Sequence, residues 1–162
     1  MAKRKATDRI DGRILRKWSY RTSASPTVVR FIDLNWCYRE CSQAFAVTDH
    51  HAYVDAVGPN FVRELRPEIF IIPAWYVNHP ATLPLRRMFS RKLYPGDRDV
   101  FATCTMEENK VYNGQFNSKM KSFDGHVIVR VAPGGETFQI VVTDNLDDTD
   151  RIKLTTGPYR CA

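Results

Sequence analysis

The sequence of 162 residues has no long apolar run, which sets a first limit on where the protein acts. No run approaches the roughly 20 apolar residues that a helix needs to cross a bilayer. The N-terminus also lacks the apolar segment of a secretory signal. We therefore expect a protein without membrane contact, placed in a reducing intracellular compartment or in a virion.

Cysteine is scarce, with four residues at positions Cys37, Cys41, Cys104 and Cys161. Four cysteines in a chain of this length are too few for a small disulfide scaffold. A chain of about 150 residues buries roughly 70% of its unfolded surface, so it needs no disulfide or metal to hold a core. The sequence thus favours four free thiols.

Several catalytic motifs are also missing. No glycine-rich phosphate loop, nucleophile elbow or Ser/His/Asp arrangement can be identified, and the glycine pair Gly134-Gly135 lies in an expected turn. The sequence therefore predicts no cofactor and favours a non-enzymatic protein, with the enzyme question left open.

The positive charge, in contrast, is concentrated at the N-terminus. Residues 1–21 hold eight basic and two acidic side chains, a net charge of +6, which equals the net charge of the whole chain. The remaining residues are therefore neutral in sum. Clustered basic side chains neutralise phosphates and give salt-dependent binding without sequence preference. The predicted nucleic-acid-binding residues of this arm are Lys3, Arg4, Lys5, Arg9, Arg13, Arg16, Lys17 and Arg21.

The arm is expected to be partly helical. Ile10, Ile14 and Trp18 are spaced four apart, which places them on one helical face. The polar segment 22–25 and Pro26 end this element. We therefore predict an arm over residues 1–21 and a single β-rich domain over residues 22–162.

A second basic stretch spans residues 85–98. It supplies four further candidate nucleic-acid-binding residues, Arg86, Arg87, Arg91 and Lys92. The alternative is an ordinary loop whose charges are balanced by the aspartates between positions 144 and 150.

Short apolar runs predict the fold class. Alternating apolar residues at 127–131 and 138–142 flank a Pro-Gly-Gly turn, which predicts a β-hairpin. Other runs predict strands at 27–36, 53–57, 68–77, 100–106, 111–116 and 151–155, and a short helix at 59–66. The count favours an antiparallel sandwich, jelly roll or open barrel of seven or eight short strands with one or two short helices. An α+β sheet with one packed helix is the alternative.

The pair Cys37 and Cys41 directly follows a predicted strand. A strand followed by a Trp-Cys step resembles thioredoxin-like enzymes, although their cysteines are separated by two residues and these by three. The resemblance implies a thiol-disulfide oxidoreductase as one alternative function. The prediction is no metal site, and Cys37, Cys41 and His50 are the residues that a zinc ion would use if one bound.

A metal-dependent nuclease is another alternative. It requires two or three carboxylates around an ion, and the candidates near the most apolar run are Asp55, Glu64 and Glu68. The triplet Asp49-His50-His51 alone resembles a phosphoesterase motif, but the other motifs of that family are absent.

The basic arm and the predicted strands together indicate a nucleic-acid-associated structural protein. This organisation resembles that of small viral coat proteins, which implies self-association and neutralisation of packaged nucleic acid by the arm. A protein-interaction module that binds an acidic partner is the remaining alternative.

Overall fold

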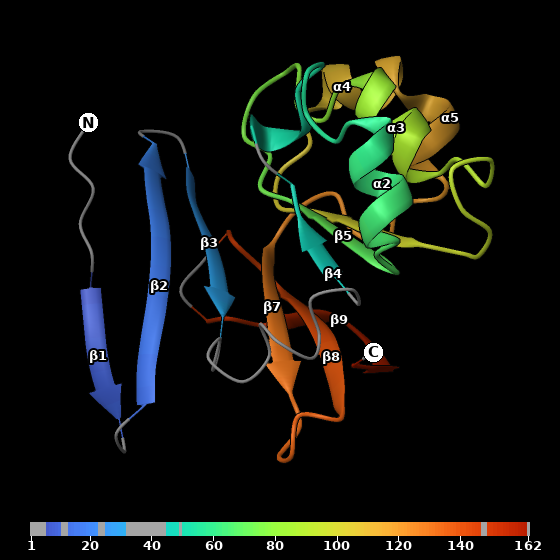
Figure 1. Cartoon of the computed structure of the whole chain (residues 1–162). Coiled ribbons are helices and arrows are strands. Elements are labelled where there is room, and N and C mark those ends of the chain that lie inside the picture. The colour runs from blue at the N-terminus through green and yellow to red at the C-terminus, as the bar shows by residue number, and fades with distance from the viewer. Residues whose placement is uncertain are drawn as a thin grey trace. The chain divides into compact units, whose positions relative to one another are not determined.

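The computed structural model describes residues 6–10, 13–22, 25–31, 45–48, 50–146 and 149–161. The chain divides into two compact units, one formed by residues 1–42 with 125–162 and the other by residues 43–124. Each unit is described by itself below (Figure 1). The predicted arm of residues 1–21 belongs to the first of these units.

Residues 43–124 form an α/β unit around a parallel three-stranded sheet of order β4-β5-β6. The strands β4 (Phe45–Val47), β5 (Ile69–Ile72) and β6 (Asp99–Ala102) alternate with helices (Figure 1). The helical elements are η1 (His50–Ala52), α2 (Pro59–Leu65), α3 (Thr82–Met88), α4 (Glu107–Tyr112) and α5 (Gly114–Asn117).

The sheet of this unit is buried on both faces. Phe70 and Ile72 of β5 pack in one apolar cluster with Val62, Leu85, Met88 and Phe116 from the helices. Ile69 and Ile71, which alternate with them, are equally inaccessible to solvent. A parallel strand buried on both faces has a continuous apolar sequence, because neither face needs polar residues.

Helix α2 has sequence signals at both of its ends. Pro59 occupies its first turn, where the missing N–H costs nothing. Arg66 adopts a left-handed backbone at the other end and donates its N–H to the Val62 carbonyl, with an N–O distance of 3.1 Å. The helix predicted at 59–66 is thereby confirmed.

The other unit contains a sheet of order β1-β2-β3-β7-β8-β9. Strands β7, β8 and β9 pair antiparallel, as do β1, β2 and β3, whereas β3 and β7 are parallel. The bounds are β1 (Ala6–Ile10), β2 (Arg13–Thr22), β3 (Ser25–Phe31), β7 (His126–Val131), β8 (Thr137–Thr143) and β9 (Ile152–Arg160).

The predicted hairpin is confirmed as β7 and β8, which pair Val129 with Ile140. Strand β9 is longer than predicted, because it continues through Gly157 and Pro158 instead of stopping before them. The register with β8 is irregular at that point, between Phe138 and Ile140, and β9 is an edge strand. An edge strand with a bulge accommodates a proline because no ladder donor is required there.

The predicted fold class is wrong. An antiparallel sandwich, jelly roll or open barrel is replaced by an α/β arrangement, β-α-β-α-β, with a separate sheet containing antiparallel β7, β8 and β9. The α+β alternative with one packed helix fails for the same reason. The error arose because short helices interrupted by prolines were interpreted as loops, which hid the crossover connections of the parallel strands.

Several local predictions also differ from the structure, among them the strand predicted at 53–57, where the described residues form turns. Residues 6–10 and 13–22 form strands instead of a partly helical arm. Residues 111–116 are helical, in α4 and α5, where a weak strand was predicted. Cys161 is disulfide-bonded, which corrects the expectation of four free thiols. In none of the described helices is there an apolar stretch long enough to cross a membrane.

Candidate functional site

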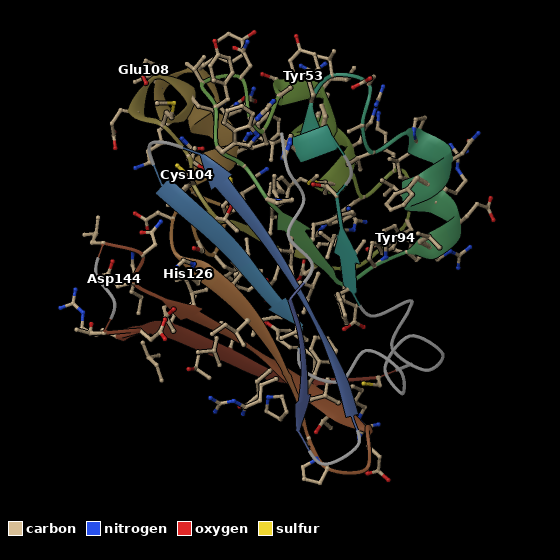
Figure 2. All side chains as sticks on the ribbon, turned by 90° about the vertical axis from the view of Figure 1, so that its left-hand side faces the viewer. Tyr53, Tyr94, Cys104, Glu108, His126 and Asp144 are labelled. Atoms are coloured by element: carbon tan, nitrogen blue, oxygen red, sulfur yellow. The ribbon has the colours of Figure 1, made fainter. Side chains whose placement is uncertain are left out.

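A cluster of histidine and aromatic side chains follows the carboxyl ends of β4 and β5. We call it the histidine–aromatic cluster, and its members are His51, Tyr53, Trp75, Tyr76 and His79. Tyr53 comes directly after η1. It is labelled near the top of Figure 2. Open parallel sheets bind their ligands at this edge, because all the loops that follow the strands meet there.

His51 is fixed in orientation by the backbone. It lies in η1 with a left-handed φ of 53°, and the following Ala52 has a φ of 54°. Two successive non-glycine residues in this region cost about 1–3 kcal/mol each. The His51 Nδ1 atom lies 2.6 Å from the Pro73 carbonyl oxygen. A carbonyl only accepts, so Nδ1 carries a proton, and in the neutral form of the ring the lone pair is then on Nε2.

His79 is the centre of the cluster. Its ring stacks on His51 with centroids 5.0 Å apart and an interplanar angle of 24°. The rings of Tyr53, Trp75 and Tyr76 approach His79 edge-on, at centroid distances of 5.8, 6.0 and 6.0 Å. His79 is only 8% exposed, whereas Trp75 and Tyr76 are 43% and 51% exposed. The cluster therefore has a buried imidazole at its centre and an accessible aromatic rim.

The loop between β5 and α3 is held by buried amides of α4 and the residue that follows it. Asn109 donates through Nδ2 to the carbonyls of Val77 and Pro80, both at 2.9 Å. Asn113 donates to the same Pro80 carbonyl and to the Asn109 side-chain oxygen, both at 3.0 Å. Asn109 and Asn113 are 3% and 0% exposed. Buried amides with satisfied hydrogen bonds fix a loop strongly, because no water can replace them.

Two more contacts tie the same loop to β6 and to η1. The Thr103 hydroxyl donates to the Ala74 carbonyl at 3.0 Å. The Ala81 N–H donates to the Ala52 carbonyl at 2.9 Å, which links the loop after β5 to the turn after β4. The cluster is thus built on a rigid frame, as a binding or catalytic site requires.

The residues predicted to bind nucleic acid through the arm lie in the other unit. Lys3, Arg4 and Lys5 lie outside the described residues. Arg9 lies in β1, and Arg13, Arg16, Lys17 and Arg21 lie in β2, where Lys17 is opposite Arg30 of β3. The backbone therefore places five of the eight arm residues in paired strands.

The second basic stretch is partly used by the fold itself. Arg87 donates to the Ala56 and Val57 carbonyls, and Arg91 forms an ion pair with Asp97. Arg86 and Lys92 are exposed. Arg98 is the last residue of this stretch. Its side chain is buried, with 7% exposed, and donates to the carbonyls of Met88 and Tyr94.

The predicted metal and redox residues are not brought together in the described part of the chain. Cys37 and Cys41 lie outside it, and His50 is described only by its backbone. Within the described residues, no three His, Cys, Asp or Glu side chains are placed to share an ion, so Asp55, Glu64 and Glu68 form no carboxylate site. Burial raises the pKa of the half-buried, free Cys104 thiol, which makes it less reactive.

Most of this cluster was not predicted from the sequence. Residues 68–77 were expected to form an edge strand, a bulged strand or two strand pieces, whereas β5 ends at Ile72 and the chain turns away at Pro73. The available signal was the polar and aromatic sequence directly after a short apolar run, from Trp75 to His79.

Comparison with known proteins gave no match to a family model, to a curated protein or to a solved structure.

Proposed function

We propose that residues 43–124 form a catalytic module in which His51 accepts a proton through Nε2 during a hydrolytic reaction. The observation that carries this proposal is the 2.6 Å contact between His51 Nδ1 and the Pro73 carbonyl. An imidazole oriented through Nδ1 directs the basic Nε2 lone pair, as a general base requires. The same orientation also suits an imidazole that ligates a metal ion.

The surroundings of His51 support a catalytic role. The site follows the carboxyl ends of two adjacent parallel strands, the frame is fixed by buried amides, and the backbone of His51 and Ala52 is left-handed. Unfavourable backbone conformations that a rigid frame maintains are concentrated at functional sites.

The test replaces His51 by asparagine. The asparagine side chain would keep a donor for the Pro73 carbonyl and tolerates a positive φ, but it lacks the Nε2 lone pair. Hydrolysis of p-nitrophenyl acetate, p-nitrophenyl phosphate and its diester is measured with and without added Zn²⁺ or Mn²⁺. We expect activity in the wild type and a loss of about 10²- to 10⁴-fold in His51→Asn.

The matched control is His126→Gln, a half-buried histidine of β7 outside the cluster, which should retain wild-type rates. Equal rates in wild type and His51→Asn, or no hydrolysis of any substrate by the wild type, would remove the proposal. A dependence on added metal would assign the Nε2 atom to metal ligation.

A second candidate function is nucleic-acid association through the arm, and its supporting observation is the charge asymmetry. Eight basic residues lie in residues 1–21 of a chain whose remainder is neutral. The coat-like role depended on a jelly roll and is not retained, since the fold is α/β with a separate sheet. Contact with phosphates requires no particular fold.

Deleting the arm is not a clean test, because the deletion would remove β1 and most of β2 from the sheet. We therefore substitute Arg13, Lys17 and Arg21 of β2 by threonine, which strands accept well. Fluorescence anisotropy with a labelled single-stranded oligonucleotide is followed at several salt concentrations. The slope of log K against log[salt] should decrease by about 2 in magnitude, at roughly 0.7 per phosphate contact.

The control substitutes three exposed basic residues of β7 and β9 by threonine: Arg130, Lys153 and Arg160. Both triple variants lose the same charge, so only a local contact distinguishes them. Equal slopes in the two variants would refute binding through the arm.

A further inference from the structure

We infer that Trp75 is a stacking platform for the planar base of a nucleotide bound at the histidine–aromatic cluster. This inference rests on the proposed function of the same site and identifies its ligand. Trp75 is 43% exposed on a loop whose backbone is held by Thr103 and Asn109. An exposed indole of fixed orientation loses little freedom when a ligand packs on it.

The described rings around Trp75 meet its indole edge-on or at a tilt. Its described ring contacts are edge-on or tilted: 82° with His51, 65° with His79 and 49° with Tyr76. Within the described residues, no ring therefore stacks parallel on the indole. A partly exposed aromatic ring next to a polar centre binds planar π-systems, and stacking of one base contributes about 1–3 kcal/mol.

The charge of the same segment favours an anionic ligand. Residues 69–96 contain Arg86, Arg87, Arg91 and Lys92 but no aspartate or glutamate. Arg86 and Lys92 are exposed. The net charge of +4 on this segment attracts anions at long range, and a nucleotide joins a planar base to a phosphate.

The position relative to His51 connects recognition to chemistry. The His51 and Trp75 ring centroids are 5.8 Å apart. A base stacked on Trp75 would therefore place the attached sugar and phosphate within reach of the imidazole. Such a geometry fits a substrate whose base is recognised at Trp75 and whose phosphoester bond is hydrolysed near His51. Water gives a proton to His51 Nε2 as its oxygen bonds to phosphorus, the P–O bond to the alcohol breaks, and the proton then passes to the leaving alcohol oxygen.

The test follows tryptophan fluorescence while AMP, adenosine or inorganic phosphate is added to the full chain. The sequence has three tryptophans, so the titration is repeated in Trp18→Phe and Trp36→Phe to assign the signal. We expect quenching by AMP and weaker quenching by adenosine, and none by phosphate. Quenching should persist in both of these variants.

Affinity is then compared among position-75 variants by calorimetry. Trp75→Leu should weaken AMP binding by roughly 5- to 150-fold, whereas Trp75→Phe should retain most of it. The matched control is Tyr112→Ala, which removes a 77% exposed aromatic side chain of α4 outside the cluster and should change nothing.

The outcomes separate this inference from the catalytic proposal. His51→Asn should still bind AMP, so a loss of hydrolysis with retained quenching supports both. Unchanged AMP affinity in Trp75→Leu, or equal affinity for AMP and inorganic phosphate, would overturn the stacking platform while leaving the role of His51 in place. Absence of any binding would overturn it as well.

Discussion

The two units of the chain differ in where their polar side chains lie relative to the strands. In the parallel unit of residues 43–124, the strands are apolar except for Asp99 at the start of β6, and polar residues gather in the loops after β4 and β5. In the antiparallel β7–β8 hairpin, inaccessible Val127 and Val129 alternate with half-buried His126 and Ile128. Sheet geometry thus concentrates chemical groups at one edge in the first unit and distributes them along the strands in the second.

The two candidate functional regions lie in different units. The parallel unit holds the rigid histidine–aromatic cluster, whereas the other unit contains the basic residues of β1 and β2. The following predictions compare the two units directly, in order of decreasing effect.

Loss of a core side chain should have the largest effect. Phe70 of β5 and Phe138 of β8 are 0% and 1% exposed. Replacing either by alanine should lower the free energy of unfolding by about 3–5 kcal/mol, through lost burial and the remaining cavity. Urea unfolding followed by tryptophan fluorescence in a Trp18→Phe/Trp36→Phe background, which leaves only Trp75, and by amide exchange in β8 measures both units.

If the two units unfold separately, each substitution will shift only its own probe. A common shift of both probes would show one cooperative transition and contradict independent stability. Val111→Ala, at a side chain 84% exposed, is the control and should change the free energy by less than about 0.5 kcal/mol.

The next effect concerns the entry into the antiparallel hairpin. Gly125 has a φ of 115°, and an added Cβ would lie 2.4 Å from the Thr143 carbonyl oxygen. Gly125→Ala should therefore cost about 2–4 kcal/mol from the backbone conformation and the clash combined. Thermal unfolding provides the measurement.

Gly134→Ala separates these two causes. Gly134 also has a positive φ, of 93°, but no atom lies within 4 Å of an added Cβ. We expect a loss of about 1 kcal/mol there. Equal losses at both positions would show that the close approach to Thr143 is unimportant.

A smaller effect is expected from the amide that holds the cluster loop. Asn109→Ala leaves the Val77 carbonyl without its donor and removes one of two donors from Pro80. The loss should be about 1–3 kcal/mol, with faster amide exchange at His79 and Ala81. Asn60→Ala, at an exposed residue of α2 that accepts a bond from Arg63, should be nearly neutral. Unchanged amide exchange at His79 and Ala81 in Asn109→Ala would show that other contacts hold the loop.

The smallest effect concerns pH dependence in the second unit. A hydrogen bond from Arg151 at 2.6 Å, helped by the Leu146 N–H, lowers the pKa of Asp144. The carboxylate therefore stabilises the fold above its unfolded pKa of about 3.9, and this contribution is lost as the pH falls through the lowered value.

Arg151→Ala should raise the pKa of Asp144 toward its ordinary value, as measured by NMR of the side-chain carboxyl group. The variant should then lose stability at neutral pH but little at low pH. Arg160→Ala, at an exposed residue of β9, provides the comparison. A pKa that stays low in Arg151→Ala would assign the shift to the backbone donor.

Part of the fold could be predicted because its signals are local. The β7–β8 hairpin has period-two alternation around Gly134 and Gly135, and helix α2 begins at Pro59. The parallel sheet could not be predicted in this way. Its three- and four-residue strands have no alternation, and the pairing of Ile71 with Phe101 joins residues 30 positions apart.

The candidate site could not be predicted from local sequence signals either. His51 was noticed only as part of a motif, and His79 and Trp75 were not considered as site residues. Their association depends on the turn at Pro73 and on the amides of Asn109 and Asn113, which lie more than 25 residues further along the chain. Nothing in the local sequence indicates such a contact.

By itself, the sequence determined the concentration of basic charge in residues 1–21, the β7–β8 hairpin and helix α2, because composition, period-two alternation and capping are local properties. Only the tertiary structure decided that β4, β5 and β6 pair in parallel. It also decided that His51 lies against His79 beside an exposed Trp75. These features follow from long-range pairing and from the burial of both sheet faces, which no short window of sequence encodes.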